Sequence, residues 1–143
     1  MAYATQTQIQ LAAGGAARLV QAADWDNDGA LDTDVLAQAQ NAADGWIDSY
    51  ARLRFATPIA APSTTLVRIA AEEAVYWLRK QRGMVTDDDR KDHEERERWC
   101  KDLAAGRVRP DEPLPAESTA VQSAWVDRPE TEPVSREGTK GFW

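Results

Sequence analysis

Residues 33–53, TDVLAQAQNAADGWIDSYARL, hold the longest helical hydrophobic pattern in the chain and decide its fold. Apolar residues recur there at spacings of three and four, which places them on one face of an α-helix. Thr33 or Asp34 can cap the start of this helix. We expect its apolar face to form the centre of a hydrophobic core. The residues of this face are Val35, Leu36, Ala39, Ala42, Ala43, Trp46, Ile47, Tyr50 and Leu53.

Helical signals also precede this stretch. Thr5 and Gln8 have the spacing of a capping box and predict a short first helix. Gly14 and Gly15 should break or bend it before residues 16–22 continue helically. A helical segment with a break or a bend is therefore predicted before the long helix.

A further helix is predicted after the long one. Pro58 and Pro62 favour an extended connection, because proline removes a backbone donor and restricts the residue before it. Ser63 then caps a helix that Gly83 should end.

The last predicted helix begins with a capping box formed by Thr86 and Asp89. Thirteen of the sixteen residues in 87–102 are charged, which indicates a largely solvent-exposed helix. Only Trp99, Cys100 and Leu103, near its C-terminal end, offer an apolar anchor. The charged face could instead contact a neighbouring subunit.

Composition changes near Gly106. Five of the seven prolines lie in the last 37 residues, where the helical pattern also disappears. We interpret residues 1–106 as the folded body and residues 107–143 as an extended C-terminal arm, disordered in the free subunit. The predicted fold class is all-α, a small helical bundle with an extended proline-rich arm.

Charge, cysteine content and hydropathy exclude several functions. The net charge of -7 would repel a phosphate backbone, so sequence-specific nucleic-acid binding is not expected. The single cysteine cannot form an internal disulfide and is typical of a reducing compartment such as the cytoplasm. No stretch approaches the roughly 18 apolar residues of a membrane span, and the N-terminus lacks the pattern of a signal peptide. We therefore expect a protein that neither spans a membrane nor is secreted through a signal peptide.

The most specific local motif is DWDNDGALD, residues 24–32. Its aspartates fall at positions 1, 3, 5 and 9 of a calcium-binding loop, and a glycine occupies position 6, where the loop turns. The candidate metal ligands are Asp24, Asp26, Asp28 and Asp32, with the backbone carbonyl of Ala30.

Position 12 of this loop is Val35 instead of the usual bidentate glutamate. Any calcium site should therefore be weak, with a Kd of roughly 10⁻⁴ to 10⁻³ M. The alternative is an Asp/Gly turn that caps the two flanking helices through hydrogen bonds from backbone to side chain.

No catalytic set is evident. His93 and Cys100 are the only residues of their types, and about 10 Å of helix separates them, too far for a Cys-His dyad. They are also too few for a zinc site, and motifs for nucleotide binding or a hydrolase nucleophile are absent. We expect a surface histidine, a packed or half-exposed cysteine, no cofactor beyond weak calcium, and no enzymatic activity.

Aromatic residues divide between body and arm. Trp46, Trp77 and Trp99 fall on apolar helix faces and are expected in the core. The arm has no core of its own, so its aromatic side chains are either exposed without a partner or anchors for a partner's pocket. The candidate partner-binding residues are Trp125, Phe142 and Trp143.

Several short motifs carry a family resemblance through their order and spacing. They are Ala2-Tyr3-Ala4-Thr5, the loop 24–32, IDSYARLRF at 47–55 followed by Pro58-Ile59, and residues 99–106. Over residues 2–106 the chain resembles the Mu-type phage head-tail connector (adaptor) family, long catalogued as a phage domain of unknown function. It departs from that pattern at Ala51, where a larger apolar residue is usual, and at Gly14-Gly15.

The resemblance implies a structural virion protein of the head-tail interface, assembled in the host cytoplasm. Such an adaptor forms a ring, implied to be dodecameric, beneath the portal protein, and it presents a surface to a tail, stopper or neck protein while DNA passes through the lumen. An acidic helical body with an unpacked arm agrees with an assembly role. The alternative is a calcium-responsive protein-interaction module.

Overall fold

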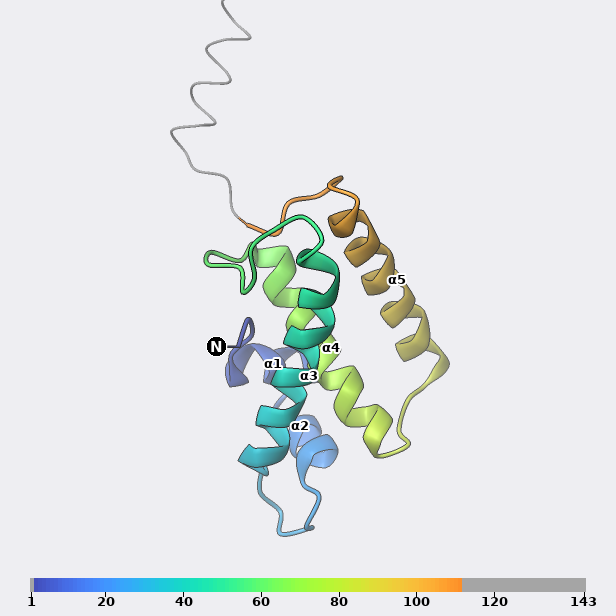
Figure 1. The fold of residues 1–143 in the computed structure, drawn as a ribbon. Helices are drawn as coiled ribbons and strands as arrows, with labels where there is room; N and C mark the ends of the chain where they lie inside the picture. The colour runs from blue at the N-terminus through green and yellow to red at the C-terminus, as the bar shows by residue number, and fades with distance from the viewer. Residues whose placement is uncertain (1, 112–143) are drawn as a thin grey trace, which may run out of the picture. The chain divides into compact units, whose positions relative to one another are not determined.

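The computed structural model describes residues 2–111, and these form five helices without a β-strand. The helices are α1 (Gln6–Ala13), α2 (Ala16–Ala23), α3 (Thr33–Ala51), α4 (Thr64–Gln81) and α5 (Asp87–Ala104). Figure 1 shows α3 and α4 crossing at the centre, with α1 and α2 packed against α4 and α5 running along the other side. The predicted all-α bundle is confirmed for these residues.

Local sequence signals begin the helices at most of the predicted positions. Thr5 forms the predicted capping box with Gln8, and Thr86 forms one with Asp89. The hydroxyl of Ser63 accepts the backbone N–H of Leu66 at the start of α4. These caps satisfy backbone donors that the first turn of a helix leaves free.

The start of α3 differs from the prediction. Its N-cap is Asp32, not Thr33 or Asp34, and Asp32 makes no side-chain capping bond. The Asp32 carboxylate instead accepts the backbone N–H of Trp25 at 2.8 Å. This hydrogen bond therefore joins the two ends of the loop between α2 and α3.

Gly14 and Gly15 separate α1 from α2 as predicted. Gly14 has φ of 95°, in the left-handed region that glycine adopts without a steric penalty, and its N–H donates to the carbonyls of Gln10 and Leu11 at the end of α1. Gly15 follows with φ of 122° and lets the chain begin α2 in a new direction.

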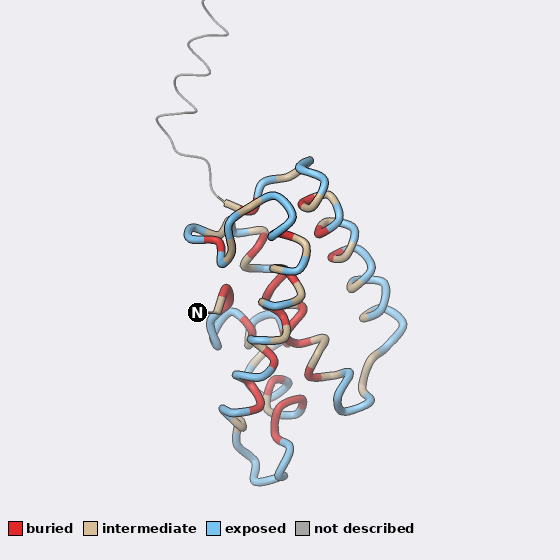
Figure 2. The backbone as a smooth tube through the Cα atoms, viewed as in Figure 1, coloured by how far each residue is buried: buried red, intermediate tan, exposed pale blue. Residues whose placement is uncertain are grey.

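The core lies where the inner faces of all five helices meet, which Figure 2 shows as the buried inner side of the bundle. On α3, Val35, Leu36, Ala39, Ala43 and Ile47 are buried as predicted. Trp46 and Tyr50 are only partly buried and pack against the edge of this core.

Leu53 contradicts the predicted core face, because it is 69% exposed. The cause is the end of α3 at Ala51, after which the backbone no longer follows the helical period. Phe55, whose N–H bonds to the Ala51 carbonyl at 2.8 Å, packs against the core in its place.

The N-terminal segment is fastened to the bundle by Tyr3. Its hydroxyl donates to Asp48 Oδ1 on α3 at 2.6 Å and accepts the backbone N–H of Ile59 at 2.9 Å. Burial and the neighbouring Asp48 raise the pKa of Tyr3. One side chain thus joins the N-terminus, α3 and the α3–α4 connection.

Residues 107–111, which the change in composition assigned to the arm, pack on the body. Pro110 is fully buried, its carbonyl accepts the N–H of Ser63 at 2.9 Å, and Asp111 forms an isolated bridge with Pro62. The chain divides into two units, residues 1–112 and residues 113–143, so the body extends beyond the predicted boundary at Gly106. None of the helices in the described part is long and apolar enough to cross a membrane.

Candidate functional site

The four aspartates of the α2–α3 loop converge on one point. One carboxylate oxygen from each of Asp24, Asp26, Asp28 and Asp32 lies within 4.8 Å of the others. Asp24 directly follows α2 and Asp32 directly precedes α3, so both ends of the set are fixed by helices. The sequence spacing therefore places these side chains together as predicted.

Backbone N–H groups of the loop support the same carboxylates. Asp24 accepts the N–H of Asp28 at 3.1 Å and that of Gly29 at 2.8 Å, and Asp28 accepts the N–H of Ala30 at 2.9 Å. Asn27 and Gly29 have φ of 61° and 84°, which turns the chain tightly enough for these bonds. The loop is thus a turn held by hydrogen bonds from backbone to side chain, but these bonds stay within the loop. The predicted capping of α3 by the turn is wrong, because Asp32 makes no capping bond there.

Crowding of these carboxylates moves two pKa values in opposite directions. Desolvation would raise the pKa of Asp24, but the N–H of Gly29 and other donors outweigh it and lower that pKa. The hydrogen bond that Asp26 shares with Asp24 raises the pKa of Asp26, and partial desolvation adds to this effect. The backbone donors around Asp24 and the hydrogen bond between the two side chains thus shift the two pKa values apart.

The loop offers oxygen ligands of the kind that calcium prefers. Val35, at the position of the usual bidentate ligand, is buried in the core and has no oxygen in its side chain. The residues present would fit a calcium ion with an incomplete ligand set.

A second polar cluster, which the sequence pattern did not predict, lies between α4 and α5. Glu73 and Arg96 are each 7% exposed, and Arg96 Nε donates to Glu73 Oε1 at 3.0 Å. His93 Nδ1 lies 3.0 Å from the same oxygen, and its ring stacks on Tyr76 with centroids 4.4 Å apart. His93 is therefore part of a helix interface and not the predicted surface histidine.

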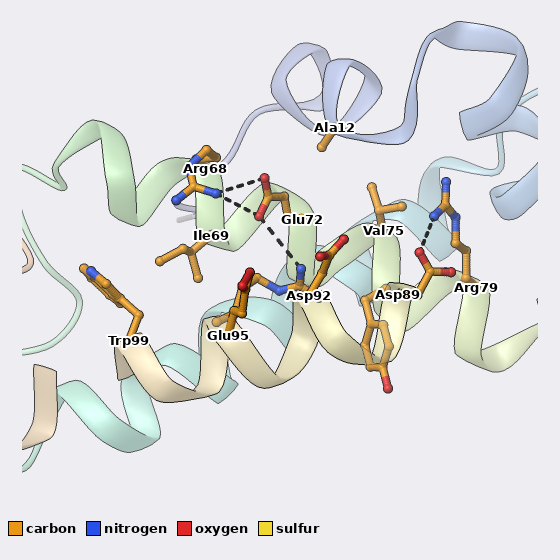
Figure 3. Close-up of a pocket in the computed structure, with 12 residues that line it drawn as sticks. Ala12, Arg68, Ile69, Glu72, Val75, Arg79, Asp89, Asp92, Glu95 and Trp99 are labelled. Carbon is orange, nitrogen blue, oxygen red and sulfur yellow. Dashed lines mark hydrogen bonds and ion pairs between the residues drawn. The ribbon is translucent and has the colours of Figure 1, made fainter. Parts of the chain in front are cut away.

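Beside this cluster a groove of about 410 Å³ opens between α4 and α5. Figure 3 shows Ile69 and Val75 along α4 and Trp99 on α5, with Ile69 the nearer of the two to Trp99 and with Ala12 of α1 at the edge of the groove. Its charged side chains are paired in part: Arg68 bonds to Glu72 at 3.1 Å and Arg79 to Asp89 at 2.9 Å. The groove therefore has an apolar floor and a charged rim.

A smaller cavity of about 240 Å³ is lined by Trp46, Trp77, Lys80 and His93, among others. Trp77 also stacks on Trp25, with ring centroids 6.1 Å apart. Trp46 and Trp77 were both predicted to lie within the core. They are only partly buried and pack against its edge.

Cys100 agrees with the predicted packed cysteine. It is completely buried, and desolvation together with the nearby Glu73 raises its pKa to about 12. Because the thiolate is the nucleophilic form, this thiol is a poor nucleophile at neutral pH.

The predicted partner-binding residues Trp125, Phe142 and Trp143 lie outside the described residues, as does most of the predicted arm. The predicted disorder of the arm in the free subunit also concerns residues outside the described part of the chain and stays a prediction.

Comparison with known protein families gives one result. A sequence model of the family described as Bacteriophage Mu, Gp36 matches residues 3–126. The matched range covers nearly the whole described body and continues through Trp125, but it ends before Phe142 and Trp143. No curated protein matches the chain.

Proposed function

The chain belongs to the bacteriophage family described as Bacteriophage Mu, Gp36, and from this premise we propose that it is a structural virion protein connecting the phage head to the tail. The observation that carries the proposal is the match over residues 3–126, which takes in the described helical bundle. The connector role itself is what the resemblance to the Mu-type connector family implies, a resemblance carried by the motifs at Tyr3, at the aspartate loop and at residues 47–55.

In this proposal the chain is an adaptor that assembles as a dodecameric ring beneath the portal protein. Its other partner is a tail, stopper or neck protein, and DNA passes through the lumen. The two residues with the greatest catalytic potential have structural surroundings: Cys100 is packed in the core and His93 bonds to Glu73. Both side chains thus contribute to the packing of α5 on the body, as expected of a protein with an assembly role.

In this proposal the C-terminal segment is long enough to contact the portal or a neighbouring copy. Residues 113–143, if extended, would span on the order of 100 Å, which exceeds the width of a neighbouring subunit. Trp125, Phe142 and Trp143 offer large apolar side chains to a pocket on the portal or on another copy. Because Trp125 lies inside the family match, we assign it the larger share of this binding.

Two truncations test this role. A chain ending at residue 112 keeps Pro110 and should retain the folded body, but it should lose stable attachment to the portal. A chain ending at residue 126 keeps Trp125 and should still attach, with reduced affinity. Attachment of each truncated chain is measured by pull-down with the portal protein and by the yield of infectious particles. Circular dichroism checks that each truncated chain is folded.

Single substitutions in the full chain refine the test. Trp125→Ala should weaken portal binding more than Trp143→Ala, which removes the same side chain outside the family match. A chain ending at residue 112 that builds infectious particles at the normal yield would contradict the proposed role of the arm.

We propose calcium binding at the aspartate loop as a second candidate function, because four carboxylates converge within 4.8 Å. A calcium-responsive interaction module would show stability and binding that depend on the metal, whereas a connector should bind the portal with or without it. The loop could also serve as a weak calcium site within a connector.

Calorimetric titration with calcium distinguishes a metal site from a turn. The wild-type chain should release or absorb heat with a Kd of roughly 10⁻⁴ to 10⁻³ M, and an Asp26→Ala, Asp28→Ala double variant should not. Because the pKa of Asp26 is raised, protons should compete with calcium and weaken binding as the pH falls toward that pKa. Equal heats for the two proteins would leave only the structural turn.

A further inference from the structure

We propose that the groove between α4 and α5 of one copy receives the loop tip at residues 52–54 of a neighbouring copy. This inference rests on the proposed function, since a ring requires a contact between copies, and it names the two surfaces that would meet. We call them the acidic groove, with Asp92 and Glu95 on its rim, and the basic tip, Arg52-Leu53-Arg54.

The acidic groove carries negative charge that the described residues leave unpaired. Each arginine that lines it already bonds to a carboxylate, Arg68 to Glu72, Arg79 to Asp89 and Arg96 to Glu73. By contrast, Asp92 and Glu95 are exposed, and neither forms an ion pair within residues 2–111. The groove is therefore ready to accept cations from outside the subunit.

Apolar surface lies beside these carboxylates. Ile69, Val75 and Trp99 line the same groove, and Figure 3 shows Ile69 near Trp99 and Val75 nearer to Asp89 and Arg79. An acidic rim above an apolar floor fits a partner that presents arginine together with an aliphatic side chain, because the guanidinium satisfies the carboxylates while the apolar group displaces water.

The basic tip offers this combination. Leu53 is 69% exposed, and few other large apolar side chains in residues 2–111 are as open to solvent. Arg52 Nε donates to the Asp48 carbonyl at 3.1 Å, and Arg54 Nε donates to the Ala104 carbonyl at 3.3 Å. Both guanidinium groups are thus oriented by backbone oxygens, but neither forms an ion pair with a carboxylate in the described part of the chain.

The two surfaces are different patches of the same chain. The basic tip follows the C-terminal end of α3, where Arg54 bonds to Ala104 at the end of α5, whereas the acidic groove lies between α4 and α5 and is also lined by Ala12 of α1. A contact between two different patches is head-to-tail, and repetition of such a contact closes into a ring when the rotation between copies allows it. The complementary charges and the matching apolar groups identify a second copy as the partner.

Charge reversal tests the contact in the full chain. The groove variant is Asp92→Lys, Glu95→Lys, and the tip variant is Arg52→Glu, Arg54→Glu. The control is Asp88→Lys, Glu94→Lys, which makes the same change in net charge as the groove variant at exposed residues of α5 that do not line the groove. Self-association is measured by sedimentation velocity over a range of concentration, and circular dichroism checks that each variant is folded.

We expect the groove and tip variants each to lower the association constant by about 10- to 100-fold, and the control to leave it unchanged. An equimolar mixture of the groove and tip variants should associate like wild type, since each acidic tip then meets a lysine groove and each basic tip meets an acidic groove. Because Arg54 also bonds to the end of α5, Leu53→Ala is a second variant that keeps all charges and should weaken association too.

Three results would overturn the inference: wild-type protein with no measurable self-association, variants that associate like the control, or a mixture that fails to restore association. The proposed function has a separate readout. A chain that fails these tests but still binds portal through residues 113–143 would remain a connector with a different contact between copies. A wild-type chain that does not bind portal would contradict the proposed function instead.

Discussion

Glu73 shows how one residue on α4 can organise a helix that has little hydrophobic surface. Its Oε1 atom bonds to both Arg96 and His93 on α5, and all three side chains are largely removed from solvent. A buried charge is tolerated only when it is paired and hydrogen-bonded. The Glu73 carboxylate therefore fixes the part of α5 that precedes its apolar anchor, Cys100 and Leu103.

Sequence reasoning could not find this cluster. Glu73 and His93 are 20 residues apart on different helices, and the charged pattern of residues 87–102 gives no sign of which arginine turns inward. The aspartate loop was predictable at the residue level because its spacing is local. Its four side chains need only one turn of backbone to converge, whereas the Glu73 cluster depends on how α4 and α5 pack.

Glu73→Gln should destabilise the body strongly. The substitution removes the nearer counter-charge of the buried Arg96 guanidinium, at 3.0 Å, and leaves only the Glu72 carboxylate, 3.8 Å away. Breaking a buried ion pair typically costs about 3–5 kcal/mol. Urea denaturation measures the free energy of unfolding. Glu97→Gln is the matched control, since Glu97 pairs with Lys101 on the exposed side of α5 and such a pair contributes below about 1 kcal/mol. Equal losses in the two variants would refute the structural role of Glu73.

At the scale of helices, capping residues and periodicity predicted most boundaries. Thr5, Ser63 and Thr86 begin helices in the structure because each hydroxyl can reach a free N–H two or three residues ahead. The error at Leu53 arose because periodicity alone does not show where a helix ends. No glycine or proline marks the end of α3, and the pattern of apolar residues continues past it.

Ile47→Ala tests whether α3 is the central helix. Ile47 is completely buried, so the variant should lose about 2–5 kcal/mol of unfolding free energy through lost burial and the remaining cavity. Leu53→Ala is the control, because its side chain is mostly exposed and its removal should change stability by less than about 0.5 kcal/mol. Thermal or chemical denaturation of both variants gives the comparison. Unchanged stability of the Ile47 variant would exclude the central role of α3.

At the scale of the whole molecule, charge is distributed unevenly along the bundle. The aspartate loop precedes α3, and the arginines of the basic tip follow it, so the two ends of this helix carry opposite charge. The body could be predicted as an acidic helical bundle from composition and periodicity. The contacts between copies could not, because they depend on which charged side chains remain unpaired after folding.

The proposed connector should turn mainly acidic surface toward its DNA channel. A net charge of -7 per chain supports this expectation, since an acidic lumen lets the genome pass without binding to it. A lumen lined mainly by arginine and lysine would contradict it.

The most direct measurement of the connector role is electron cryomicroscopy of the head-tail junction in the assembled phage particle. We expect density for the five-helix body, repeated as a dodecameric ring directly beneath the portal, with the C-terminal segments in contact with the portal or with adjacent copies. A complete junction in which every density is accounted for by other proteins, with no copy of this chain, would contradict the connector role.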